Sequence, residues 1–193
     1  MSKINFYYNR ADDVKNWTRH HEQHIPTLSK SLQFLLEQNI VTLQKTWNFL
    51  GSNIIQALEK TLEKPNTTTK YTSALTTYHS CPYDPAHNWF MVSIKASLPS
   101  QITNIAHELL HLQFIHHYGD YCHKMKINEK QFHILKESLT VILNTSRFQK
   151  IIPALDKGYS EHQKIRQKVF GAYKPTMKFQ KFLDHTIKII KTN

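Results

Sequence analysis

The chain carries the stretch His107-Glu108-Leu109-Leu110-His111 just past its middle. On a helix, residues four apart lie on the same face about one turn from each other, so the two imidazoles can reach one metal ion. The glutamate beside the first histidine can then hold a metal-bound water and take its proton. The stretch therefore predicts a helical metal site with Glu108 as general base.

The residues around this stretch have the pattern of an enclosed helix. It is expected to begin at Pro99 or Ser100, and Ser100 is a good N-cap. Its apolar residues cover much of the circumference, which is typical of a buried helix; they are Ile102, Ile105, Leu109, Leu110, Leu112 and Phe114. The two histidines are thus expected under cover, as metal ligands or, alternatively, as core histidines bonded to backbone carbonyls.

A catalytic zinc site needs a third protein ligand. Glu137 is the favoured candidate, because it lies on a predicted helix over residues 129–144 with apolar neighbours on its own face. An ionised carboxylate in such surroundings is costly unless a cation is near, either a metal or a Lys or Arg. His117 has the spacing of the metzincin pattern, but Phe114 stands where that pattern needs glycine. His133, one turn before Glu137, is a further candidate as ligand or as partner of a ligand.

H-E-x-x-H followed 26 residues later by a helical glutamate resembles the gluzincin group of zinc metallopeptidases. In particular, His107–Leu112 together with Lys136–Asn144 is similar to a small set of zincin-like proteins. The resemblance covers roughly residues 99–145. It implies a zincin-like domain with zinc on His107, His111 and Glu137.

The resemblance also implies that Glu108 acts as general base, and it has one departure from the family pattern. Gluzincins often carry an acidic residue four positions after the glutamate ligand, which orients a metal-binding histidine. This chain has Val141 there. Thr140, Asn144 or a backbone carbonyl is therefore expected in that role.

Hydrolysis of an amide also needs a donor for the oxyanion of the transition state. Tyr159 and His162 are the favoured candidates, because they stand at i, i+3 near the start of a predicted helix after Gly158. Other His and Tyr residues follow the metal helix more closely; they are His116, His117, Tyr118, Tyr121 and His123.

The rest of the chain predicts an α+β fold that is mostly helical. Residues 12–37 and 40–63 have helical periodicity, with Asp12 or Asp13 as a cap and a break near Pro26. Residues 71–78 and 89–94 are expected to form strands, as a hairpin or small β-sheet that precedes the metal-binding helix. Such a sheet can hold a peptide substrate as an added strand.

We expect one domain over residues 1–193, with a helical N-terminal part (1–65), a sheet and metal-binding core (70–145) and a basic helical C-terminal part (146–193). The last part holds 11 Lys/Arg and 3 Asp/Glu, so it carries +8 of the net +11. Its lysines alternate with apolar residues at helical spacing, which favours a solvated helix face over a nucleic-acid surface.

Composition limits the remaining choices. Two cysteines, Cys81 and Cys122, are too few for a disulfide scaffold and are expected to be reduced. No apolar run approaches the roughly 20 residues that span a bilayer, and the N-terminus has no signal-peptide pattern, so a cytoplasmic protein is expected. The pair His20 and His24 is interpreted as a solvated face rather than a second metal site.

The sequence thus favours zinc-dependent hydrolysis of peptide or amide bonds, with a peptide or protein as substrate. The alternative is a non-catalytic zinc-binding module whose partner is another protein.

Overall fold

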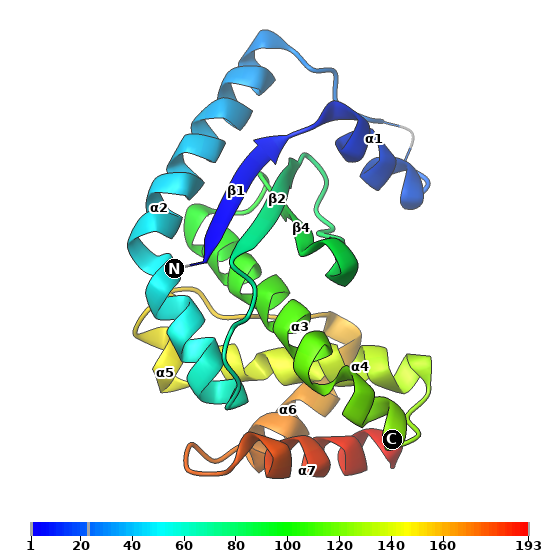
Figure 1. The fold of residues 1–193 in the computed structure, drawn as a ribbon. Coiled ribbons are helices and arrows are strands. Elements are labelled where there is room, and N and C mark those ends of the chain that lie inside the picture. Colours follow the sequence, from blue (N-terminus) through cyan, green and yellow to red (C-terminus); the bar gives the residue numbers. More distant parts are fainter. Residues whose placement is uncertain (1, 23, 193) are drawn as a thin grey trace.

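The computed structural model describes residues 2–22 and 24–192 and has an α+β architecture (Figure 1). In these residues a four-stranded mixed sheet has the order β1-β2-β4-β3. Strands β1 (Lys3–Tyr8), β2 (Lys70–Thr76) and β4 (Trp89–Ser93) are parallel, and the short edge strand β3 (Tyr83–Asp84) is antiparallel to β4. The small sheet that the sequence predicts is confirmed.

The pairing of the predicted strands differs from a hairpin. β2 and β4 run parallel, because the chain between them turns back through β3 and a 3-10 turn, Pro85–His87. The N-terminal part is also not purely helical as predicted. In β1 the residues Ile4 and Phe6 are buried while Lys3 and Asn5 are exposed, and this period-two alternation is typical of a strand.

Two helices follow β1. Helix α1 (Arg10–Arg19) is capped by the side chain of Asn9, and not by Asp12 or Asp13 as expected. Helix α2 (Lys30–Leu62) runs unbroken through residues 38–39, where two separate helices are predicted. The predicted break near Pro26 is confirmed, since α1 ends at Arg19 and α2 begins at Lys30. A single buried stripe explains the length of α2; it consists of Leu36, Leu43, Trp47, Ile54 and Leu58.

Helix α3 (Leu98–Lys124) carries the central motif and packs against α2 and β4. Its N-cap is Ser97 rather than Ser100, and Pro99 lies in the first turn. Helix α4 (Glu129–Leu139) ends earlier than predicted and continues as a 3-10 turn, Thr140–Asn144. The lower part of Figure 1 holds α4 with the later helices; these are α5 (Ser146–Gln149), α6 (Gln163–Ala172) and α7 (Phe179–Lys191).

One buried apolar cluster extends from Ile4 in β1 to Ile190 in α7 and includes most of the apolar face of α3. Both cysteines are free, as predicted, and Cys122 lies in this cluster. Across the described residues, none of the helices combines the length and the apolar character needed to cross a membrane.

Candidate metal centre

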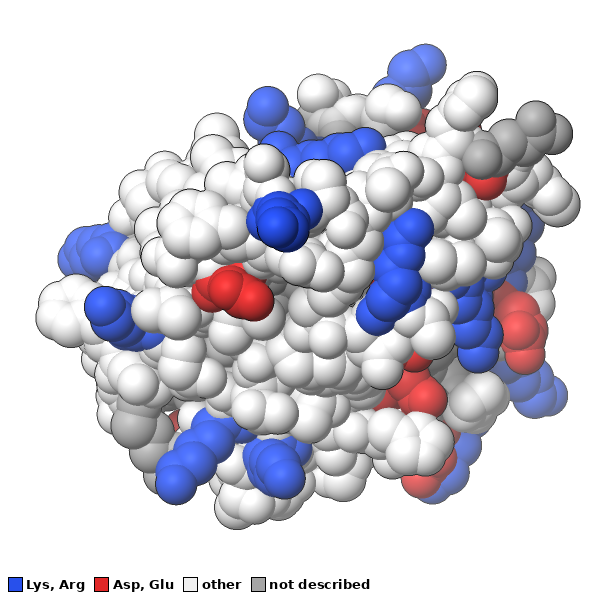
Figure 2. All heavy atoms as spheres, turned by 90° about the horizontal axis from the view of Figure 1, so that it is seen from above, with Lys and Arg blue, Asp and Glu red and all other residues white. Residues whose placement is uncertain are grey.

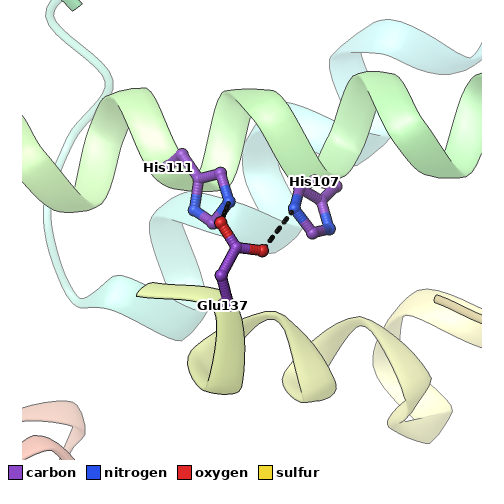
Figure 3. A group of neighbouring side chains, drawn as sticks. All are labelled: His107, His111 and Glu137. Atoms are coloured by element: carbon purple, nitrogen blue, oxygen red, sulfur yellow. Dashed lines mark ion pairs between the residues drawn. The ribbon is translucent and has the colours of Figure 1, made fainter. Parts of the chain in front are cut away.

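Three side chains from two helices converge on one point (Figure 3). His107 and His111 project from one face of α3, and Glu137 projects toward them from α4. The Nε2 atom of His107 lies 3.5 Å from Oε2 of Glu137, and Nε2 of His111 lies 3.2 Å from Oε1. The candidate ligand atoms all lie within 4.8 Å of one another. The predicted ligand set is thus brought together.

These distances fit a tetrahedral metal ion. Ligand atoms about 2.0–2.1 Å from such an ion are about 3.3 Å apart. His111 and Glu137 are 1% and 3% exposed, yet His111 Nε2 and Glu137 Oε2 have no hydrogen-bond partner. Buried polar atoms are normally paired, and a cation between these atoms would satisfy both. The donor set therefore fits a bound divalent ion.

The charges and pKa shifts of His107, His111 and Glu137 also fit a bound divalent ion. Burial raises the pKa of Glu137, but the neighbouring imidazoles of His107 and His111 hold it far below its usual range. Burial and the charge of His107 lower the pKa of His111 to about 4, so this imidazole is neutral, as a ligand must be. Burial disfavours charge on His107, yet Asp156 and the two glutamates raise its pKa well above 6.5. These carboxylates therefore favour a positive charge at this point, which is the kind of charge that a metal ion would supply.

Asp156 orients His107, although no motif or periodicity in the sequence marks this residue. The Nδ1 of His107 donates to Oδ1 of Asp156 at 2.9 Å, which turns Nε2 toward Glu137. Arg166 of α6 donates to Oδ2 of Asp156 at 2.7 Å and to the backbone oxygen of Glu137 at 2.6 Å. One buried guanidinium therefore ties together the segments that hold the ligands.

Thr140 and Asn144 were expected to contact a histidine. They contact Asp156, Glu137 and Arg166 instead. The side chain of Asn144 accepts a hydrogen bond from the backbone nitrogen of Asp156 at 2.8 Å and donates one to the backbone oxygen of Asp156 at 2.9 Å. The hydroxyl of Thr140 donates to the backbone oxygen of Glu137 and accepts from Arg166. The expected direct role was wrong, because the loop after α5 brings a carboxylate, Asp156, to His107 instead.

Glu108 has the environment of a general base. It is 6% exposed, its Oε2 has no hydrogen-bond partner, and it lines a cleft of about 470 Å³ together with His107, Asp156 and Tyr159. Burial raises its pKa to about 8, reinforced by Glu137 and opposed by His107. A proton-accepting carboxylate thus faces the cleft beside the ligand cluster.

A buried network holds one wall of this cleft. Asp13 of α1 is fully buried and accepts hydrogen bonds from the backbone and hydroxyl of Thr77 and from the hydroxyl of Thr76, each at 2.8 Å. The side chain of Asn16 donates to the oxygen of Ser80 at 2.9 Å. Helix α1 therefore positions the residues that follow β2, of which His79, Ser80 and Cys81 line the cleft.

The two predicted oxyanion donors are placed differently. Tyr159 lines the cleft and is half exposed, and burial followed by the charges of Glu137 and Glu108 raises its pKa to about 12. His162 does not line the cleft; its ring lies 5.9 Å from that of His133 and 6.2 Å from that of Tyr159. Of these two residues, Tyr159 alone lines the cleft together with Glu108.

The other histidines lie outside the cluster. His117 packs against His116, with ring centroids 4.7 Å apart, and is not a member of the candidate metal-binding group. His133 contacts His162 instead of a ligand. His20 stacks on Tyr78 at 4.8 Å. Glu137 is therefore the third member of the cluster.

No family model, curated protein or solved structure matches this chain. The chemistry of the site is therefore derived from its own residues. Two imidazoles and one carboxylate bind several divalent transition metals, zinc among them.

Tyr83 and Lys136 border the candidate ligands on the side of His111, and neither residue was predicted from the sequence to belong to the site. The ring of Tyr83 lies 5.2 Å from that of His111. Lys136 is 9% exposed, and its ammonium donates to the hydroxyl of Tyr83 and lies 4.8 Å from the centre of the same ring. Burial and the charges of Glu108 and Glu137 raise the pKa of Tyr83.

Proposed function

We propose that this chain is a zinc-dependent metallopeptidase of the gluzincin type with a zincin-like fold. The observation that carries the proposal is the Glu108 carboxylate, which is buried, has an unpaired oxygen and faces a cleft next to His107. A purely structural glutamate would be paired in such surroundings. A general base needs a free oxygen at this place.

The roles of the site residues follow from their positions. His107, His111 and Glu137 would hold the zinc ion. When bound, zinc supplies a Lewis acid for the scissile carbonyl and lowers the pKa of a coordinated water. Glu108 takes a proton from the attacking water and passes it to the leaving amine. Asp156 fixes the orientation of His107, since its carboxylate can only accept from Nδ1.

The sheet supports an extended peptide as substrate. Strand β3 forms the sheet edge, and its residue Tyr83 contacts His111, so this edge lies beside the ligands. An edge strand offers free main-chain groups to a peptide backbone. Tyr159, one of the two oxyanion donors favoured from the sequence, lies on the cleft side of the site.

A non-catalytic zinc module that binds a protein partner is the second candidate. Such a module would need zinc but not the unpaired Glu108 beside a cleft. Nucleic-acid binding is less well supported. On the face in Figure 2, lysines and arginines are spread singly or in small groups over largely uncharged surface. In α7 the apolar residues Phe182, Leu183 and Ile187 are buried, which leaves its lysines on an ordinary solvated face.

The test is Glu108→Gln in the zinc-loaded protein. We expect zinc content to stay at the wild-type value and cleavage of a peptide library, followed by mass spectrometry, to be lost. Glu129→Gln, on the exposed first turn of α4, is the matched control and should leave both unchanged. Cleavage retained in Glu108→Gln would disprove the mechanism. A wild type that binds zinc but cleaves nothing would favour the protein-binding module.

A further inference from the structure

Lys136 is a buried cation that the mechanism above does not use. It stands directly before the ligand Glu137 on α4, and only 9% of it is exposed. Burying an ammonium is unfavourable unless hydrogen bonds or opposite charges compensate it. The carboxylates of Glu108 and Glu137 act on it electrostatically, and the hydroxyl of Tyr83 accepts its hydrogen bond.

The bond between Lys136 and Tyr83 determines where the phenolic hydrogen points. An ammonium has three donors and no acceptor, so the oxygen of Tyr83 must be the acceptor in this pair. The hydroxyl hydrogen is then directed away from Lys136 and is left for a different acceptor. No other hydrogen bond of the Tyr83 hydroxyl is found among the described residues.

The position of Tyr83 restricts what that acceptor can be. Its ring packs against His111, with centroids 5.2 Å apart, and the carboxylates of Glu108 and Glu137 are near enough to act on it electrostatically. Packing against the ring of His111 and the hydrogen bond from Lys136 hold the phenol in place. A hydrogen-bond donor that is preorganised beside a metal ligand can stabilise negative charge that develops in the transition state.

We propose that Tyr83, positioned by Lys136, donates a hydrogen bond to the oxyanion of the tetrahedral transition state at this metal centre. The inference rests on the metallopeptidase function proposed above. Tyr83 is then the catalytic residue and Lys136 the positioning residue, on the His111 side of the site. Tyr159 borders the same site from the cleft and is free to contact the substrate there.

The experiment compares Tyr83→Phe with the wild type in the zinc-loaded form. We expect unchanged zinc content, a kcat lower by about 10²–10³-fold and a KM within about twofold, because the lost contact forms only in the transition state. Binding of a phosphonamidate peptide, which mimics the tetrahedral oxyanion, should weaken at least about tenfold. Binding of a mercaptoacetyl dipeptide, which carries no oxyanion, should not change.

Two further variants separate this role from a structural tie between β3 and α4. Lys136→Met should weaken phosphonamidate binding as Tyr83→Phe does, and Lys136→Arg should recover part of it, since a guanidinium can also donate to the phenol. Tyr173→Phe, on a partly buried ring against Phe182, is the matched control and should change nothing.

Each remaining outcome decides the inference. Equal phosphonamidate affinity in Tyr83→Phe and wild type would overturn it, as would a wild type that does not bind the phosphonamidate. An equal loss of phosphonamidate and thiol binding would show that Tyr83 only shapes the site, and would also overturn it. If zinc is bound and the wild type cleaves no peptide, the proposed function fails separately, while the two inhibitors still report on Tyr83.

Discussion

The carboxylate of Asp156 accepts a hydrogen bond from His107 Nδ1 at 2.9 Å, although 49 residues separate the two in the chain. The same carboxylate accepts from Arg166 at 2.7 Å, so neither of its oxygens is free. His107 therefore has one ring nitrogen committed and the other turned toward Glu137. This arrangement preorganises a ligand for a metal ion.

Asp156→Asn should lower zinc affinity about 10–100-fold, the usual cost of removing a partner of a histidine ligand. His107 and Arg166 bond to different oxygens of Asp156, and in asparagine one of these two positions becomes an NH2 donor, so one of the two bonds is lost. Affinity is measured by competition with a chromophoric chelator. Asp184→Asn removes a carboxylate that accepts from Tyr121 away from the site and should not change affinity. Equal affinities in both variants would refute the role of Asp156.

Glu137→Ala should remove stoichiometric zinc, whereas His117→Ala should retain it. Glu137 contacts both histidines of the cluster, and His117 packs against His116 outside it. Metal analysis of the two purified variants beside the wild type is the measurement. Loss of zinc in His117→Ala alone would instead indicate a metzincin-type site.

Gly158→Ala should lower the free energy of unfolding by about 1–3 kcal/mol, the usual range for a strained backbone position. Gly158 has φ of +58°, and an added Cβ would lie 2.6 Å from the guanidinium carbon of Arg166. Displacement of Arg166 should also weaken zinc binding. Urea unfolding measures the first effect and chelator competition the second.

Gly171→Ala is the control for Gly158→Ala. Outside the chain neighbours and nearby helix backbone, no described atom lies within 4 Å of an added Cβ at Gly171, near the end of α6. Alanine in a helix should stabilise the protein by up to about 1 kcal/mol and leave zinc affinity unchanged. Similar losses in the two variants would show that the contact with Arg166 is not the cause.

The stability of the metal-free protein should depend on pH through Glu108. Folding raises the pKa of this carboxyl from 4.5 to about 8, chiefly through burial. Between these values the folded protein holds a proton that the unfolded chain has released, so stability falls as pH rises. Relative to Glu108→Gln, the wild type should lose stability from about pH 4.5 to pH 8 and then level off. Urea unfolding with chelator at pH 5, 6.5 and 8 tests this, and a constant difference would contradict it.

The sequence by itself was sufficient to predict that His107, His111 and Glu137 come together. His107 and His111 are close because helical periodicity is local, and their separation of four residues places both on one face. Glu137 was identified because a carboxylate among apolar helix positions needs a cation. The mostly helical α+β class also followed from local patterns, since α3 and α4 have strong apolar periodicity.

Tertiary structure alone decided the parts that depend on distant segments. β1 was missed because its six residues are recognisable as a strand only when β2 pairs with them, and the parallel pairing of β2 with β4 is set by packing and not by sequence order. Asp156 lies in a loop without periodicity, so no pattern marks its bond to His107. From the sequence, Lys136 is indistinguishable from an exposed helical lysine. Its role depends on β3, which places the Tyr83 hydroxyl next to it.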